Sequence, residues 1–134
     1  MTWDAYIEEH LLHELKEGSG RTLSFAAIIG LDGGIWAQSS DFPDASPEQI
    51  EVLINAFDDE TVLQEKGIHL GDNRYIAIQG EAGSVIRGKK GPTGFTAKKT
   101  KTAFVIGGYS EGTQPGECNV VVENVADELI GDDY

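Results

Sequence analysis

Residues 67–108 decide the fold and have the sequence GIHLGDNRYIAIQGEAGSVIRGKKGPTGFTAKKTKTAFVIGG. Short runs of strand-forming residues alternate in this stretch with turns made of Gly, Pro, Asp and Asn. The connections are too short for crossover helices and are typical of antiparallel neighbours. We therefore expect an antiparallel meander whose strands are 68–70, 74–79, 84–88, 95–99 and 102–106.

The residues before the meander predict a helix and a hairpin. Apolar side chains recur at helical spacing over residues 2–15, with Trp3 and Tyr6 along one edge of the apolar arc. Strand formers then stand on both sides of the turn at residues 32–34, which predicts a β-hairpin of strands 23–29 and 35–37.

Two further helices are expected. Ser46 is followed by Pro47 and Gln49, a combination that favours the start of a short helix. Pro115 opens a longer helix that Gly131 is placed to end. The residues expected on its inward face are Cys118, Val122, Val125 and Leu129. This register favours core packing of Cys118 over a reactive thiol.

The order of elements predicts an α+β fold in one domain, residues 1–134. The fold class is a central antiparallel β-sheet with the N- and C-terminal helices packed on one face and short helices on the other. Because the two terminal helices are the longest amphipathic elements, we expect them to cover the same face. That arrangement would bring Trp3 and Tyr6 close to Leu129 and Tyr134.

Composition favours a soluble cytosolic protein, and a monomer is the default expectation. The chain has 134 residues, of which 40% are hydrophobic and 25% charged. The sequence contains no apolar run of membrane-spanning length and no signal-peptide pattern. A single cysteine agrees with a reducing compartment.

The charge distribution is uneven. A net charge of −13 argues against nucleic-acid binding. Residues 82–110, however, contain no acidic residue and hold six of the ten Lys and Arg. We expect a local positive field there, although a solvated basic hairpin would have the same composition.

No pattern in the sequence requires an enzyme, a cofactor or a metal. Residues 83–90 imitate a phosphate-binding loop, but Lys90 stands where the motif needs Ser or Thr. His10 and His13 are spaced like metal ligands but lack a third ligand at a recognisable spacing.

The chain resembles the profilin family over essentially its full length, and the plant and algal branch most closely. The segments that carry this resemblance are TWDAY (2–6), AIIG (27–30), WAQSS (36–40), FP (42–43), HLG (69–71), IQGEAGSVIRGKKG (78–91), KKT (98–100) and PGECN (115–119). The resemblance implies a protein of the cytoplasm and cytoskeleton that binds actin monomers and regulates their polymerisation.

The resemblance also implies three binding sites. A site for polyproline, and hence for proline-rich proteins such as formins, matches Trp3, Tyr6, Trp36, Leu129 and Tyr134. An actin-binding face matches Arg74, Arg87, Lys89, Lys90, Gly116, Asn119 and Glu123. A phosphoinositide-binding stretch matches Arg87, Lys89, Lys90, Lys98 and Lys99.

One position departs from the family pattern, because Glu128 stands where animal members place a histidine that lines the polyproline groove. This departure and the acidity of the chain leave an alternative. The alternative is an adaptor of the same fold that keeps polyproline or lipid binding and has lost actin binding.

Overall fold

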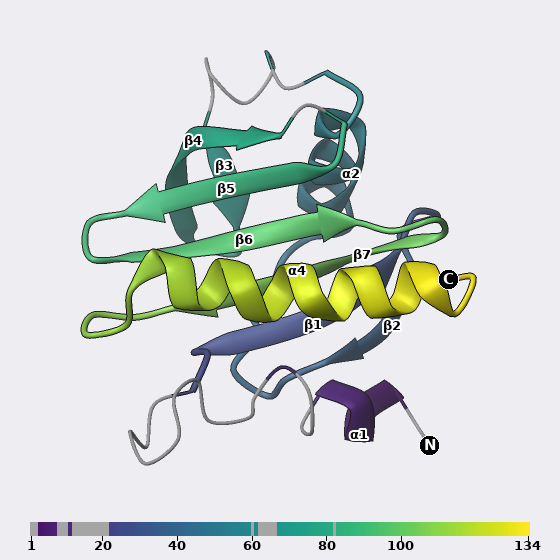
Figure 1. Cartoon of the computed structure of the whole chain (residues 1–134). Coiled ribbons are helices and arrows are strands. Elements are labelled where there is room, and N and C mark those ends of the chain that lie inside the picture. Colours follow the sequence, from purple (N-terminus) through teal and green to yellow (C-terminus); the bar gives the residue numbers. More distant parts are fainter. Residues whose placement is uncertain (1–2, 8–10, 12–21, 60, 62–66, 82) are drawn as a thin grey trace.

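The expected meander forms the larger part of one antiparallel sheet in the computed structural model of the chain (Figure 1). The structure describes residues 3–7, 11, 22–59, 61, 67–81 and 83–134. Within them the strand order is β2-β1-β7-β6-β5-β4-β3, with every neighbouring pair antiparallel. The strands are β1 (Phe25–Gly30), β2 (Ile35–Gln38), β3 (Ile68–Leu70), β4 (Asn73–Glu81), β5 (Val85–Lys90), β6 (Thr93–Lys99) and β7 (Ala103–Tyr109). Both the meander and the first hairpin are confirmed.

Strand β7 does not end at Ile106, as the sequence predicted, but continues to Tyr109. Gly107 and Gly108 lie inside the strand and allow close packing. A Cβ atom on Gly108 would lie 2.1 Å from an atom of the Phe25 ring. The glycines therefore leave the space that a neighbouring aromatic side chain fills.

The turn between β5 and β6 is also tighter than expected. Strand β5 runs to Lys90 and β6 begins at Thr93, so that Gly91 and Pro92 alone form the connection. Gly91 has φ +56°, in the left-handed region that glycine adopts readily and that two-residue hairpin turns require.

One face of the sheet is covered by α2 (Pro47–Ala56). Its start is the predicted capping box, in which the Ser46 hydroxyl accepts from the Gln49 N–H and the Gln49 side chain accepts from the Ser46 N–H. Ile50 and Leu53 on its inner side join a buried cluster that includes Phe57, Phe95 and Phe104.

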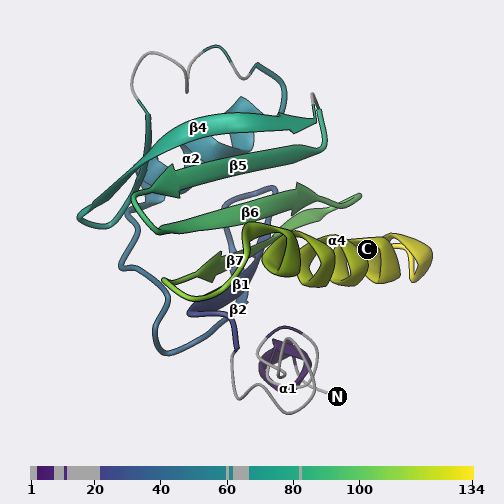
Figure 2. The same ribbon diagram turned by 60° about the vertical axis from the view of Figure 1, so that its left-hand side comes forward.

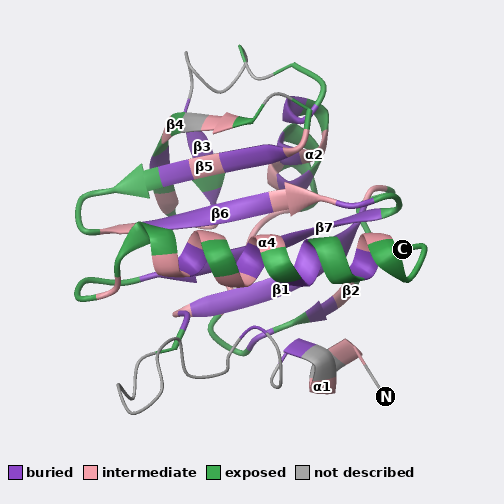
Figure 3. Cartoon of the chain, viewed as in Figure 1, coloured by how far each residue is buried: buried purple, intermediate pink, exposed green. Residues whose placement is uncertain are grey.

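The opposite face carries the helices from both ends of the chain, α1 (Trp3–Tyr6) and α4 (Pro115–Gly131), as expected (Figure 2). Buried Ile7 and Leu11 share one apolar cluster with Val122 and Leu129. The remainder of the predicted helix 2–15, including Leu15, lies outside the described residues. In α4 the buried residues alternate with exposed ones around the helix (Figure 3), so the helix lies on the sheet by a single apolar stripe.

The end of α4 differs in one respect from the prediction. Gly131 is its last residue, but the left-handed position belongs to Asp133, with φ +68°. The chain therefore turns two residues later than a helix-ending glycine would turn it, and this turn places Tyr134.

Candidate functional site

Three aromatic side chains from distant parts of the sequence lie in mutual contact. Ring centroids are 5.1 Å apart for Trp3 and Trp36, 5.0 Å for Trp3 and Tyr134, and 6.0 Å for Trp36 and Tyr134. Both tyrosine contacts are edge-on, a favourable arrangement for aromatic rings. We call Trp3, Trp36 and Tyr134 the aromatic cluster. It forms because α1, β2 and the end of α4 meet on one side of the sheet.

The aromatic cluster lies at the surface and is not part of the closed core. The Tyr134 side chain is 43% exposed, and Trp3 and Trp36 are half-buried over the apolar cluster beneath α4. Leu129, which the resemblance matched to the same site, is 1% exposed and belongs to that apolar cluster. It can support the rings but offers no surface of its own. The Tyr6 side chain lies outside the described residues.

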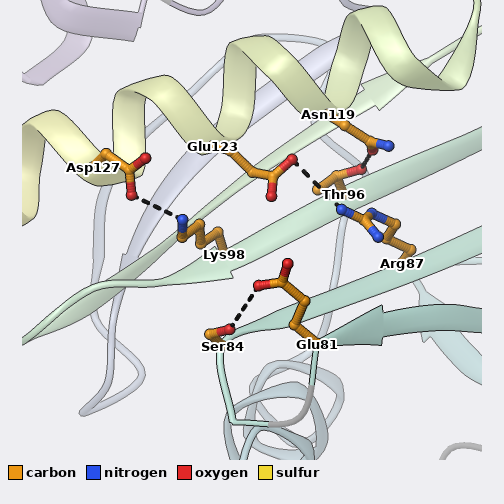
Figure 4. Close-up of polar contacts among 8 residues, drawn as sticks. All are labelled: Glu81, Ser84, Arg87, Thr96, Lys98, Asn119, Glu123 and Asp127. Atoms are coloured by element: carbon orange, nitrogen blue, oxygen red, sulfur yellow. Dashed lines mark hydrogen bonds and ion pairs between the residues drawn. The ribbon is translucent and has the colours of Figure 1, made fainter.

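The basic segment is paired with acidic side chains of α4 (Figure 4). Arg87 lies 3.5 Å from Glu123 and Lys98 lies 2.8 Å from Asp127, each measured between nitrogen and oxygen. Lys101 is held in the same way by Asp133 at 2.8 Å. The fold thus brings carboxylates against three of the six basic side chains of residues 82–110, which weakens the local positive field expected there.

The matched actin-binding residues lie on three elements, β4, β5 and α4, and all except Lys90 belong to the α4 side of the sheet. Arg87 on β5 and Glu123 on α4 form the ion pair above, and Thr96 beside Arg87 donates to the Asn119 side chain (Figure 4). Gly116 is exposed in the first turn of α4, and Arg74 is exposed on β4.

The five matched phosphoinositide residues do not form one patch. Alternation along the strands puts Arg87, Lys89 and Lys98 on the α4 side of the sheet and Lys90 and Lys99 on the other side. The Lys90 amine is exposed and donates to the Asn73 side chain at 2.9 Å.

Sequence reasoning missed two exposed residues on the α4 side of the sheet, Ile76 and Ile78. They are 64% and 42% exposed and pair with Lys89 and Arg87 across β4 and β5. The signal was the unbroken apolar run 75–78, which indicates a strand with two apolar faces. Tyr75 and Ala77 meet the core on the α2 side, whereas α4 packs against β6 and β7. The second face of β4 is therefore left to solvent, or to a partner.

Other candidate chemistry is resolved by the fold. Residues 85–90 of the phosphate-loop imitation form strand β5 and lead into another strand, whereas a phosphate loop opens a helix. Cys118 is buried, its thiol donates to the Gly107 carbonyl at 3.2 Å, and burial raises its pKa to about 12. The predicted core role of Cys118 is confirmed.

The described part of the chain contains no metal-ligand cluster and no membrane-spanning helix. No three His, Cys, Asp or Glu side chains in residues 3–7, 11, 22–59, 61, 67–81 and 83–134 are grouped as metal ligands, while His10 and His13 lie outside these ranges. None of the described helices combines the length and apolar character needed to cross a membrane.

Comparison with known proteins decides the family. The sequence model of the family described as Profilin matches residues 1–134. The chain belongs to the profilin family. Acanthamoeba castellanii profilin II is 39% identical to it, with 99% of this chain and 100% of that chain covered and a TM-score of 0.87. The Schizosaccharomyces pombe profilin is 35% identical over the same shares, with a TM-score of 0.85.

A more distant profilin was solved with a ligand. Mouse profilin IIa, in complex with a double repeat from the FH1 domain of mDia1, is 20% identical over 100% of both chains, with a TM-score of 0.77. At this identity the likeness shows the shared fold, which is the arrangement of sheet and terminal helices expected from the sequence.

Proposed function

We propose that this chain binds proline-rich segments and actin monomers on separate surfaces, and regulates actin polymerisation without catalysing a reaction. The observation that carries the proposal is the aromatic cluster, in which rings from α1, β2 and the end of α4 form one partly exposed apolar surface. The exposed apolar residues Ile76 and Ile78 of β4 form the second surface.

The aromatic cluster fits a proline-rich ligand. Polyproline segments adopt an extended left-handed helix without internal hydrogen bonds, so they lose little conformational entropy on binding. Grooves lined with aromatic side chains hold such helices by flat apolar contact and by hydrogen bonds from the ring N–H and O–H groups. The formin-derived FH1 repeat bound to the mouse relative supports the same ligand class here.

The surface of Ile76, Ile78, Arg87 and Lys89 fits a protein partner. Two exposed isoleucines supply apolar area, and basic side chains from the neighbouring strand border them. Apolar contacts at the centre of an interface supply most of its affinity, whereas charged residues mainly steer and orient the encounter. Actin, the partner implied by the family, is acidic, so the basic border is complementary.

Anionic phosphoinositide headgroups are the proposed ligands of Arg87, Lys89, Lys90, Lys98 and Lys99, and would have to contact both sides of the β5–β6 hairpin. Lys89 and Lys90 are exposed at the β5 end of the hairpin. Each basic side chain near an anionic surface contributes about 1 kcal/mol. Arg87 and Lys98 would have to exchange Glu123 and Asp127 for lipid phosphates, so we expect weak and reversible attachment.

On this proposal the protein acts as a single-domain monomer in the cytoplasm and at the actin cytoskeleton. The motif at residues 78–91 supports a place in the plant and algal branch of the family.

Gel filtration of the chain with monomeric actin, with and without a labelled proline-rich peptide, tests the proposal. We expect the chain to co-elute with actin and to carry the peptide into the same peak, because the two surfaces are formed by different elements. Binding of the peptide without actin would favour the adaptor alternative. Binding of neither would overturn the proposal.

A further inference from the structure

We propose that the turn between β6 and β7, residues 100–102, is a positioning device for the aromatic cluster, acting through the backbone of Tyr134. Hydrogen bonds from Thr100 and Thr102 to Tyr134 carry the positioning role. Its consequence for ligand affinity rests on the proposed binding of proline-rich segments.

Among the described residues, the backbone oxygen of Tyr134 accepts hydrogen bonds from this turn. The donors are the Thr102 N–H at 2.6 Å, the Thr102 hydroxyl at 2.7 Å and the Thr100 hydroxyl at 3.0 Å. The Tyr134 N–H donates to the Leu129 carbonyl at 2.8 Å. Both backbone polar groups of Tyr134 are therefore fixed, one by the sheet turn and one by α4.

The Thr100 hydroxyl can donate to the Tyr134 oxygen at 3.0 Å or to the Ala103 carbonyl at 3.1 Å. The side chain is buried, and its oxygen accepts from the Ala103 N–H at 3.1 Å. The Ala103 carbonyl already accepts the Thr100 N–H at 2.8 Å. Because a hydroxyl has one proton to donate, the Thr100 bond to Tyr134 is one of two alternatives. The Thr102 N–H and hydroxyl are therefore the principal donors to the Tyr134 oxygen.

The segment after α4 needs such an anchor. Residues 131–134 are all exposed, and Asp133 has φ +68°, in the left-handed region that residues other than glycine adopt less readily. The ion pair between Lys101 and Asp133 is exposed on both sides, and such pairs contribute little. The hydrogen bonds of Thr100 and Thr102 are therefore the contacts that keep the Tyr134 ring edge-on to Trp3 and Trp36.

A preformed ring cluster binds a rigid ligand better than one that must be ordered first, since the ordering cost is removed from the binding step. Loss of a side-chain hydrogen bond to Tyr134 should thus weaken polyproline binding although no ligand contact is removed. Thr100 and Thr102 are positioning residues in this account, while Tyr134 is the contact residue.

The test compares Thr102→Val, which removes the exposed hydroxyl at similar shape, with Thr102→Ser, which keeps it. Lys101→Met in the same turn is the matched control. The two tryptophans of the chain are both in the aromatic cluster, so intrinsic tryptophan emission reports on the cluster alone. We expect Thr102→Val to change the emission spectrum and to raise the Kd for decaproline about threefold to tenfold, the equivalent of one hydrogen bond. Thr102→Ser and Lys101→Met should leave both readings near the parent values.

A second arm separates positioning from general destabilisation. In a Tyr134→Ala background the further change Thr102→Val should have no effect on the Kd, because the ring that it positions is gone. An equal effect in both backgrounds, an unchanged emission spectrum for Thr102→Val, or an equal response to Lys101→Met would overturn the inference. Should the parent chain not bind decaproline at all, the proposed function fails, and the emission spectra of the valine and serine variants still decide the positioning role.

Discussion

The indole ring of Trp3 and the phenol ring of Tyr134 lie edge-on with 5.0 Å between their centroids, although they stand near opposite ends of the sequence. The contact exists because α1 and α4 cover the same face of the sheet and share one apolar cluster. Rings held in this way form a surface that neither helix has alone. The proposed binding of proline-rich segments depends on this surface.

Removal of the Trp3 ring should abolish retention on polyproline resin. For Trp3→Ala we expect at least a tenfold loss of affinity, because aromatic residues at the centre of a contact surface carry a large share of the binding energy. Binding to monomeric actin should be nearly unchanged. Phe42→Ala is the matched control, since Phe42 is also half-buried and packs edge-on against Phe25 outside the cluster. Equal loss of both ligands by Trp3→Ala would mean that the variant is merely unfolded.

The exposed isoleucines of β4 should carry affinity for actin. Ile76→Asp puts a carboxylate into the proposed interface, and we expect the dissociation constant for monomeric actin to rise at least tenfold. The stability of the variant should change by no more than about 0.5 kcal/mol, since the side chain is exposed. Val52→Asp makes the same change at an exposed apolar position on α2, on the other face. If the two variants bound actin equally well, the assignment of this face would be wrong.

Neutralising Glu123 should strengthen attachment to anionic lipid. Glu123→Gln removes the carboxylate that lies 3.5 Å from the Arg87 guanidinium, so binding to vesicles that contain phosphoinositide should increase about fivefold at low salt. The gain should fall as ionic strength rises. Glu128→Gln removes the same charge from an exposed position of α4 and should have a smaller effect. Cosedimentation with vesicles measures both, and equal gains would mean that only net charge matters.

Alkaline pH should destabilise the fold through Cys118. Burial raises its pKa from the ordinary 9.0 to about 12, so the unfolded chain loses the thiol proton above pH 9 while the folded chain keeps it. The contribution of the protonated Cys118 thiol to the free energy of unfolding is fully present below pH 9. It declines between pH 9 and 12, at about 1.4 kcal/mol per pH unit. Burial also raises the pKa of Tyr75 and of Tyr109, which adds to the decline at its upper end.

Cys118→Ala should reduce this pH dependence. Urea unfolding at a series of pH values gives the slope for each protein, and the slope of the variant should be shallower whatever its stability at pH 7. An identical slope in the variant would show that the thiol is not the group responsible.

A methyl group at Gly108 should be costly. Because the added Cβ atom would lie 2.1 Å from the Phe25 ring, the ring or the strand must move, and we expect Gly108→Ala to lose about 1 to 3 kcal/mol of unfolding free energy. Gly116→Ala is the control, since no atom lies within 4 Å of its added Cβ. Equal stability of the two variants would contradict the packing role of the glycines in β7.

The fold could be predicted from the sequence where the signals are local. The capping box at Ser46, the turn at residues 32–34 and the apolar stripe of α4 each depend on neighbouring residues alone. The end of β7 was predicted too early because the sequence does not distinguish a glycine that ends a strand from one that makes room for a side chain. Only the pairing of Gly108 with Phe25 shows that the strand continues.

The sites were harder to predict because they depend on tertiary contacts. The basic character of residues 82–110 was visible in the sequence, but its neutralisation required Glu123, Asp127 and Asp133 to lie against it. Leu129 followed the family pattern, and only the structure shows it beneath the rings. The exposure of Ile76 followed from the position of α4 over β6 and β7, which strand periodicity does not contain.

The most direct test of the central claim is an NMR titration of the 15N-labelled chain with decaproline, observed at its two tryptophan indole N–H signals. Both indoles belong to the aromatic cluster, so we predict that both signals shift with one common dissociation constant. The chemical shifts of the Ile76 and Lys89 backbone amides should not change. Indole signals that do not move at saturating peptide would contradict the account.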